Sequence, residues 1–215
     1  MSTWSSIPKA WIRINPPNGI PVPLSLIKQH ARLPTEPDWT EDDALLEQYA
    51  LTAETLIEEE AEVSLRLQTW RLWLPTLPTT WTLTGLPRDT IPVRLERPAP
   101  PNTGGTFSVV AVQYVDSNDQ VVPVTSYSVL ETVPPLLLVP SLLGSRLNQS
   151  RADAFQVDFT AGSPVLSPVA TQLILLLVGF WYRNREAVGT SPLRSDPLGL
   201  AYESLLNRLR WRAYP

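Results

Sequence analysis

The sequence predicts an α+β fold: a small helical bundle with an inserted antiparallel β region, an extended N-terminal arm and a C-terminal helix and tail. Two segments indicate helices, because residues 40–62 repeat apolar side chains at helical spacing and residues 168–185 are apolar on nearly every side. Between them, apolar side chains recur at every second position, as in strands. The expected parts are the arm (1–23), the helical core (24–64 and 167–189), the β region (65–166), and the C-terminal helix and tail (190–215).

The composition argues against several classes of function. With no cysteine, the chain forms no disulfides or thiolate metal sites and suits a reducing cytoplasm. A net charge of -4 argues against tight binding to a phosphate backbone, which needs clustered Lys and Arg. The longest apolar run, residues 169–182, is shorter than the ~20 residues that span a bilayer, so we expect no membrane segment.

The first 23 residues carry five prolines, which predicts an extended arm that is ordered against another molecule. Trp4 and Trp11 are its candidate anchors to a neighbour, because tryptophan is enriched at interfaces. The alternative is that both tryptophans fold back onto their own domain.

Two helices are expected next. Residues 25–33 form a short helix with Ser25 as N-cap and Pro34 as its stop. Thr40 caps the following helix, with Asp43 at the reciprocal position. Its apolar stripe consists of Leu45, Leu46, Tyr49, Ala50, Ala53, Leu56, Ile57 and Ala61. The opposite face is expected to be acidic and includes Glu54, Glu58 and Glu62.

A β region follows from residue 65, where the apolar period changes to two. Asp116 begins a predicted hairpin turn that ends at Asp119. Further strands are expected at 80–83, 91–95, 106–115, 120–124, 126–130, 136–139 and 155–159.

The C-terminal part predicts two more helices. Ser167 caps the first and Pro168 starts it, and this helix runs to about Arg185 and is buried all round. After Gly189 a loop leads to Asp196-Pro197, which starts an amphipathic final helix with apolar Leu200, Tyr202, Leu205, Leu206 and Leu209.

Motifs for catalysis or metal binding are missing from the sequence. His30 is the single histidine, and a metal site needs clustered ligands. Asp153 with Asp158 is the one carboxylate pair in the β region that could act on a glycoside, and nothing distinguishes it from ordinary polar residues. No nucleophile elbow or phosphate loop is present. We therefore expect neither an enzyme nor a bound cofactor or metal.

Charge is segregated along the chain. Between Glu41 and Glu62 there are acids and no bases, whereas six arginines follow Tyr182. Opposite poles suit head-to-tail association, in which one face meets a different face of the next copy. The alternative is that the poles are solvated helix faces.

Three blocks of sequence carry a resemblance to a known family. The first is residues 26–33 (LIKQHARL). The second is residues 41–47 (EDDALLE), continued by 56–58 (LIE) and 67–72 (LQTWRL). The third and most specific is residues 172–188 (QLILLLVGFWYRNREAV). In order and spacing the chain resembles the head–tail connector, or adaptor, proteins of long-tailed bacteriophages and gene transfer agents.

The resemblance implies a structural virion protein made in the host cytoplasm and located in the neck. Such proteins form a ring of twelve copies between the portal and the tail-completion or stopper protein, and double-stranded DNA passes through without sequence recognition. In the family the C-terminal helix and tail reach the portal. Carried onto this chain, the portal contacts are Leu205, Arg208, Leu209, Arg210, Trp211, Arg212 and Tyr214.

Glu54, Glu58 and Glu62 are candidates for the lining of the DNA channel, because an acidic wall repels phosphate. Ala31 departs from the family pattern, as do the long arm and the long β region. The alternative function is a carbohydrate- or protein-binding β module of a phage tail, with Trp70 and Trp73 as a stacking platform.

Overall fold

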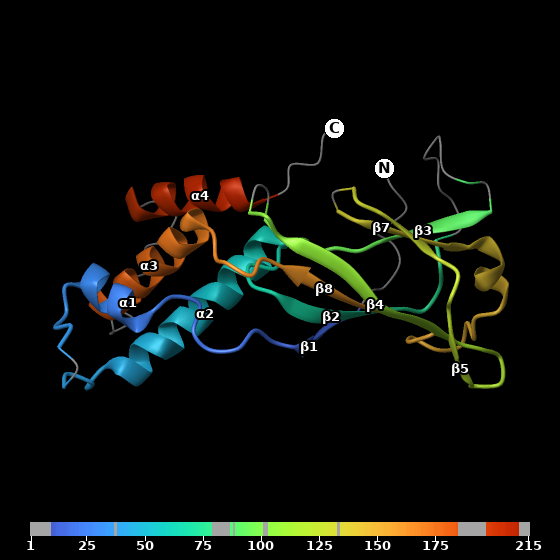
Figure 1. Ribbon diagram of the computed structural model, residues 1–215, viewed down its shortest axis with the longest axis horizontal. Coiled ribbons are helices and arrows are strands. Elements are labelled where there is room, and N and C mark those ends of the chain that lie inside the picture. The colour runs from blue at the N-terminus through green and yellow to red at the C-terminus, as the bar shows by residue number, and fades with distance from the viewer. Residues whose placement is uncertain are drawn as a thin grey trace. The chain divides into compact units, whose positions relative to one another are not determined.

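The computed structural model describes residues 10–36, 38–78, 87, 89–100, 103–132, 134–184 and 197–210. These residues form four α-helices and two antiparallel sheets of five and three strands, which confirms the α+β class (Figure 1). The chain divides into two compact units. The β unit comprises Met1–Pro16, Leu67–Pro98 and Thr106–Gly162, and the helical unit comprises Pro17–Arg66, Ala99–Gly105 and Ser163–Pro215.

The helical unit consists of α1 (Leu24–Ala31), α2 (Asp43–Ala61), α3 (Pro168–Arg183) and α4 (Pro197–Leu209). Helix α3 contacts the other three helices, and most of its apolar side chains lie in the core of the unit. Leu176 and Phe180 are half-buried and lie outside that core, so the predicted burial on all sides is confirmed only in part. The predicted stripe of α2 is likewise buried or half-buried. The fully buried positions of this core include Ile27, Leu46, Ala50, Ile57, Leu173, Ile174 and Leu206.

The predicted start of α3 is confirmed, and those of α1 and α2 need correction. Ser167 Oγ accepts a hydrogen bond from the Ala170 amide at 3.2 Å, and Pro168 is the first residue of α3. Ser25 does not cap α1, because the helix already begins at Leu24. Thr40 does not cap α2 either, because its carbonyl closes a turn on the Asp43 amide before the helix begins.

The five-stranded sheet has the order β1-β2-β8-β4-β5, and all its neighbours are antiparallel. Its strands are β1 (Ala10–Asn15), β2 (Gln68–Leu74), β8 (Phe155–Gly162), β4 (Thr106–Val115) and β5 (Val121–Pro123). The three-stranded sheet has the order β3-β7-β6, from β3 (Thr90–Arg94), β7 (Leu136–Pro140) and β6 (Ser128–Leu130). A 3₁₀ helix, η2 (Ser141–Ser145), follows β7.

Side chains that alternate between the two faces of each strand form the core of the β unit. In β2, Gln68, Trp70, Leu72 and Leu74 are buried while the residues between them are half-buried. Six of the predicted further strands are found, and residues 80–83 lie outside the described part of the chain. Residues 10–15 of the predicted arm form β1, so pairing with β2 orders this segment against its own chain.

Helix α3 is the most apolar helix of the described residues. Its 16 residues fall short of a membrane span, and no other helix in the described ranges combines the necessary length and hydropathy.

Candidate functional site

The helical parts of the three sequence blocks, residues 26–33, 41–47 with 56–58, and 172–184, lie in the helical unit, whereas residues 67–72 of the second block belong to the β unit. The His30 imidazole of the first block packs on Gly179 of α3, where an added Cβ would lie 3.3 Å from the ring. Tyr182 Oη donates a hydrogen bond to an Asp42 carboxylate oxygen, which ties the third block to the second. Together these contacts form one packing site that sets the positions of α1, α2 and α3.

His30 lies on the side of α1 that faces α3. Burial, followed by the nearby positive charge of Arg183, lowers the pKa of the imidazole below its ordinary value. A neutral imidazole against a glycine is a packing residue, and the described residues contain no group of His, Asp and Glu that could hold a metal ion.

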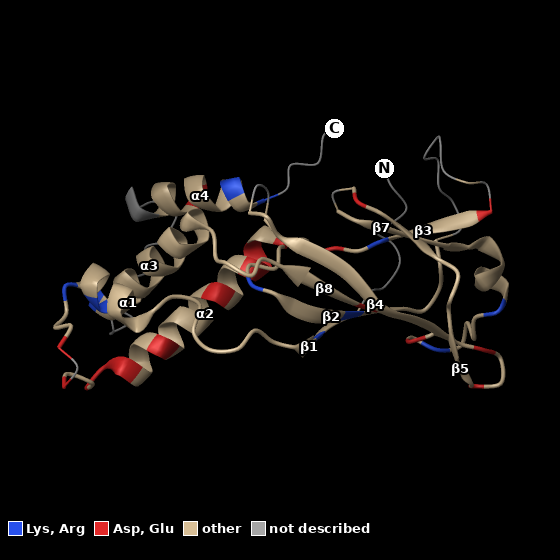
Figure 2. Cartoon of the chain, viewed as in Figure 1, with Lys and Arg blue, Asp and Glu red and all other residues tan. Residues whose placement is uncertain are grey.

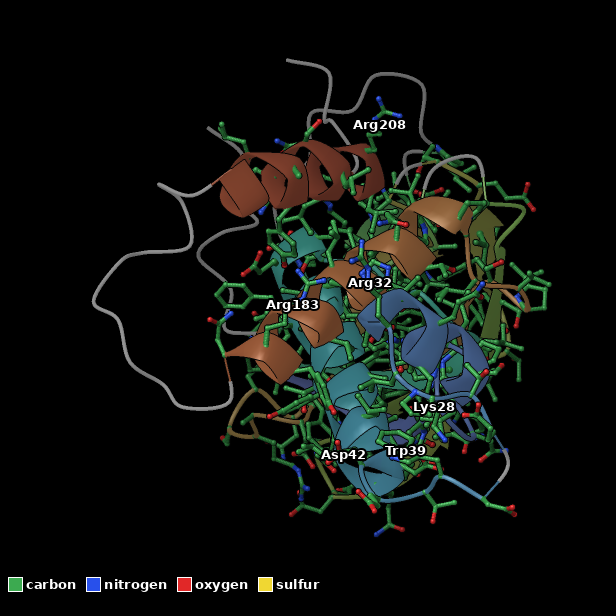
Figure 3. All side chains as sticks on the ribbon, turned by 90° about the vertical axis from the view of Figure 1, so that its left-hand side faces the viewer. Lys28, Arg32, Trp39, Asp42, Arg183 and Arg208 are labelled. Atoms are coloured by element: carbon green, nitrogen blue, oxygen red, sulfur yellow. The ribbon has the colours of Figure 1, made fainter. Side chains whose placement is uncertain are left out.

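Lys28 anchors the loop between α1 and α2. It is only 7% exposed, and its Nζ donates to the Trp39 carbonyl at 2.7 Å and lies 2.7 Å from Asp43 Oδ1. The same ammonium sits 5.0 Å from the centre of the Trp39 ring (Figure 3). This contact orders the loop that leads into α2, and sequence reasoning missed it.

Two of the predicted channel-lining residues, Glu54 and Glu58, are buried inside the helical unit. Glu54 is 3% exposed and accepts two hydrogen bonds from Arg66, at 2.6 and 2.7 Å. Glu58 Oε1 accepts a hydrogen bond from the Leu65 amide at 2.8 Å. Only Glu62 of the three is exposed, just after the end of α2. Glu54 and Glu58 thus have structural partners in this unit.

Arg66 is the centre of this arrangement. Besides Glu54, its guanidinium donates to the carbonyl oxygens of Asn18 and Gly19 at 2.8 and 3.0 Å. It therefore joins α2, the segment before α1 and the chain leaving α2. The sequence pointed to Arg66 only as one position of a strand.

Helix α4 is held to α2 by its polar as well as its apolar side chains. Tyr202 Oη donates to Glu60 Oε2 at 3.0 Å, and Arg210 Nε donates to the Glu60 carbonyl at 3.1 Å. Burial, then the Glu60 carboxylate, raises the pKa of the Tyr202 hydroxyl. The end of α2 and α4 are thereby fixed to each other.

The predicted portal contacts occupy different environments on and after α4. Leu209 is 2% exposed and belongs to the core, and Leu205 packs against it half-buried. Arg208 is exposed on α4 (Figure 3), whereas Arg210 is half-buried. Trp211, Arg212 and Tyr214 lie outside the described residues.

The predicted arm anchors can be placed only in part. Trp11 lies on β1, and its ring meets Phe159 edge-on at 5.9 Å between centroids, within the β unit. For Trp11 the contact is therefore with its own domain, the alternative that the sequence left open. Trp4 lies outside the described residues.

The tryptophans of β2 are not arranged as an open stacking platform. Trp70 is buried, and the guanidinium groups of Arg13 and Arg97 lie 5.0 and 4.8 Å from its ring centre. Trp73 is half-buried, and its Nε1 donates to Gln156 Oε1 at 3.2 Å. These rings stabilise the sheet.

Asp158 and Asp153 each pair with an arginine. Arg71 donates to both Asp158 oxygens at 2.7 and 2.8 Å, and this hydrogen bonding raises the pKa of Arg71. Arg151 donates to both Asp153 oxygens at 2.8 Å, which lowers the pKa of Asp153. Both carboxylates are therefore ion-pair partners.

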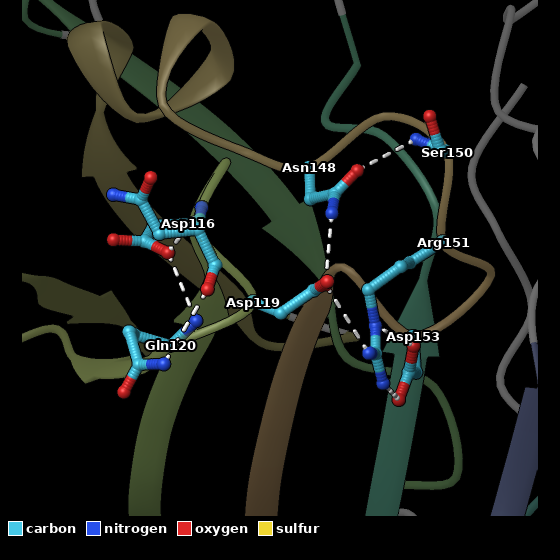
Figure 4. Close-up of polar contacts among 8 residues, drawn as sticks. Asp116, Asp119, Gln120, Asn148, Ser150, Arg151 and Asp153 are labelled. Atoms are coloured by element: carbon cyan, nitrogen blue, oxygen red, sulfur yellow. Dashed lines mark hydrogen bonds and ion pairs between the residues drawn. The ribbon is translucent and has the colours of Figure 1, made fainter.

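The predicted hairpin turn between β4 and β5 is confirmed. Asp116 Oδ1 accepts hydrogen bonds from the amides of Asn118 and Gln120 at 2.8 and 2.9 Å (Figure 4). Asp119 in turn accepts from Asn148 at 3.0 Å and lies 3.4 Å from Arg151. The tip of the hairpin is thereby fastened to the loop that precedes β8.

Charge is unevenly distributed over the helical unit. Figure 2 shows acidic residues concentrated along α2 and before it. The exposed acids of this region are Glu36, Asp38, Glu41, Glu47, Glu59, Glu60 and Glu62. Among the described residues of the unit, the exposed bases are Arg32, Arg183 and Arg208, on or just after other helices.

Three solved structures contain a chain similar to almost all of this one. A chain in the neck of an empty gene transfer agent (GTA) particle computed with C6 symmetry is 20% identical, with a TM-score of 0.64 over 96% of this chain and 97% of that chain. A chain in the virion of a native GTA particle is 21% identical, with a TM-score of 0.62 over 95% and 97%. A chain in the neck of a native GTA particle computed with C12 symmetry is 19% identical, with a TM-score of 0.61 over 96% and 97%.

No protein-family model and no curated protein sequence matches the chain. At 19–21% identity, the likeness establishes a shared fold that includes both units.

Proposed function

We propose that this chain is a structural subunit of the neck of a phage-like or GTA-like particle. It forms a ring between the portal and the tail-completion or stopper protein and extends the channel through which double-stranded DNA passes. The observation that supports this most is the whole-chain likeness to neck structures, with 96% of this chain and 97% of the other covered. Because both units correspond, the proposal does not depend on one shared motif.

A ring requires two different faces on each copy. Two of the similar neck structures were computed with C6 and C12 symmetry, and we propose twelve copies here. In a closed ring each copy offers one face to the preceding neighbour and another to the following one. The uneven charge of the helical unit is compatible with such a head-to-tail arrangement.

The channel wall should not bind DNA tightly. A net charge of -4 and the exposed acids on α2 support weak contact with phosphates. Glu62 is exposed, and so are Glu47 and Glu59. We propose these three as candidates for the lumen, whereas Glu54 and Glu58 hold the unit together.

We assign the portal contact to the end of α4 and the residues that follow it. Leu209 fixes α4 to the core, which leaves the exposed Arg208 available to a partner. Trp211, Arg212 and Tyr214 follow directly and provide the aromatic and guanidinium groups that are frequent at interface centres.

Deletion of the gene in a strain that produces the particles tests this function. The expected result is DNA-filled or empty heads without attached tails in electron micrographs, restored by the intact gene. The intact chain should be detected by mass spectrometry in purified particles. Normal tailed particles from the deletion strain would refute the proposal.

A further inference from the structure

The five-stranded sheet has two edges that the described residues leave open. One is β1, which pairs with β2 on one side only. The other is the first part of β4. On its outer side, β5 pairs with residues 113–115 and Val124 donates to the Val112 carbonyl at 2.8 Å. Among the described residues, the backbone of residues 106–111 pairs with β8 alone.

The open part of β4 has few of the features that normally protect a sheet edge. All ten residues of β4, TFSVVAVQYV, including the open residues 106–111, carry no charge and contain no proline. Val110 is 60% exposed and lies at a β-bulge. This bulge is the one feature of residues 106–111 that normally protects a sheet edge from pairing with another strand. Charged residues, prolines and short strands usually prevent such edges from recruiting other strands.

The remaining described edges are protected. Strands β5 and β6 have three residues each, and β5 ends in Pro123. Strand β3 contains Pro92. Among the edges that the described residues form, residues 106–111 of β4 are thus the one that is extended and uncharged. Strand β1 is the other long edge, with Ile12 and Ile14 exposed on it.

We infer that β1 of one copy adds to residues 106–111 of the next copy, so that the five-stranded sheets join edge to edge around the ring. This inference rests on the ring proposed above. Backbone chemistry indicates what kind of segment binds such an edge, because another extended strand satisfies the amides and carbonyls along a sheet edge. The two open edges match in length, at six residues each.

Strand direction supports the match. The strands β1, β2, β8 and β4 alternate in direction, so β4 runs opposite to β1. Rotation about a ring axis along the strands keeps the direction of β1 in the next copy. The junction is then antiparallel, as in the rest of the sheet. Matching faces restrict Ile12 to alternate positions of β4, such as Val110 or Ser108, so that the exposed aliphatic side chains of both edges lie on one face of the joined sheet.

Cysteine pairs test this junction in assembled particles, because the native chain contains no cysteine. The variants combine Ile12→Cys with Val110→Cys, or Ile12→Cys with Ser108→Cys to allow for the neighbouring register. Particles are purified from strains carrying each variant, oxidised, and analysed on non-reducing gels with an antibody against the chain. The expected result is a ladder at multiples of 24.0 kDa for at least one pair.

Three other outcomes are informative. If the chain is absent from particles of the unmodified strain, the proposed function fails and the inference fails with it. If the chain is present but neither pair gives a ladder, the inference is overturned while the proposed function stands. If Ile12→Cys alone gives dimers, β1 pairs with another β1 and the inference is again overturned.

A charge variant provides a second test that does not depend on register. Val110→Lys places a charge at an exposed position and should fold normally, but it should reduce incorporation into particles at least tenfold. Val165→Lys is the matched control, because Val165 is 73% exposed and lies outside the sheets, and its incorporation should be unchanged. Normal incorporation of the Val110→Lys chain would contradict the inference.

Discussion

Arg66 joins three segments of the helical unit, and Arg66→Met tests how much that unit depends on it. The substitution keeps the aliphatic stem and removes the guanidinium. Glu54, which is 3% exposed in the native chain, then loses the partner of its carboxylate. The carbonyl oxygens of Asn18 and Gly19 lose their hydrogen-bond donors. Breaking a buried ion pair from one side costs about 3–5 kcal/mol.

We expect the lower end of that range, because the Arg66 side chain is 14% exposed and solvent can partly replace it. The free energy of unfolding should fall by about 3 kcal/mol. Urea titration followed by circular dichroism at helical wavelengths is the appropriate assay, since the chain divides into two compact units and a helix signal reports on the unit that contains Arg66.

The second half of the test is the double variant Arg66→Met with Glu54→Leu. Removing both charges eliminates the unpaired carboxylate, so stability should return to within about 1 kcal/mol of the native chain. Arg208→Met is the control, because Arg208 is exposed on α4 and its loss should not shift the unfolding midpoint. A loss below about 1 kcal/mol for Arg66→Met would show that the ion pair does not organise this unit.

Four further predictions concern Gly179, His30 and Trp11. Gly179→Ala should destabilise the native chain but stabilise a His30→Ala chain by up to about 1 kcal/mol, because only the first has a ring 3.3 Å from the new Cβ; equal effects in both would contradict this. Proton NMR of the single histidine should give a pKa below 6.5 that rises in Arg183→Gln. Stability supplied by neutral His30 should be complete above pH 6.5 and decline as the pH falls through that value toward the lowered folded pKa, and no such decline in unfolding titrations would contradict it. Trp11→Ala should cost about 2 kcal/mol in urea unfolding, through loss of the edge-on contact with Phe159, and an unchanged midpoint would show that β1 is held by pairing alone.

Local signals in the sequence were sufficient for most elements. Ser167 and Pro168 determine the start of α3 by a capping bond and a fixed φ angle, both of which involve adjacent residues. The alternation in β2 and the Asp116 turn are equally local. Segments of this kind can be predicted without knowledge of what they pack against.

The burial of Glu54 and Glu58 was not predicted, although a signal exists. The two glutamates follow Ala50 at intervals of four and so share a face with the apolar stripe. Their partner, Arg66, lies beyond the end of the helix, and only the fold brings its guanidinium to Glu54. Because of this long-range pairing, Glu54 lies in the interior of the helical unit and not on a solvated acidic face.

Strand order was also inaccessible from the sequence. The pairing of β1 with β2 joins residues 54 to 63 positions apart, from Asn15 with Thr69 to Ala10 with Trp73, and the proline-rich segment before α1 indicated an arm. The open edge of β4 is visible only once β5 is seen to cover its last residues. The open edge at residues 106–111 therefore depends on the order of the strands, which the sequence does not reveal.

A localised cryo-electron microscopy reconstruction of the particle neck is the measurement that tests the proposed ring. We expect a closed ring of copies of this chain beneath the portal, around a channel wide enough for double-stranded DNA, with α4 and the residues after it directed to the portal. A neck without this chain, or single copies that do not touch one another, would contradict it.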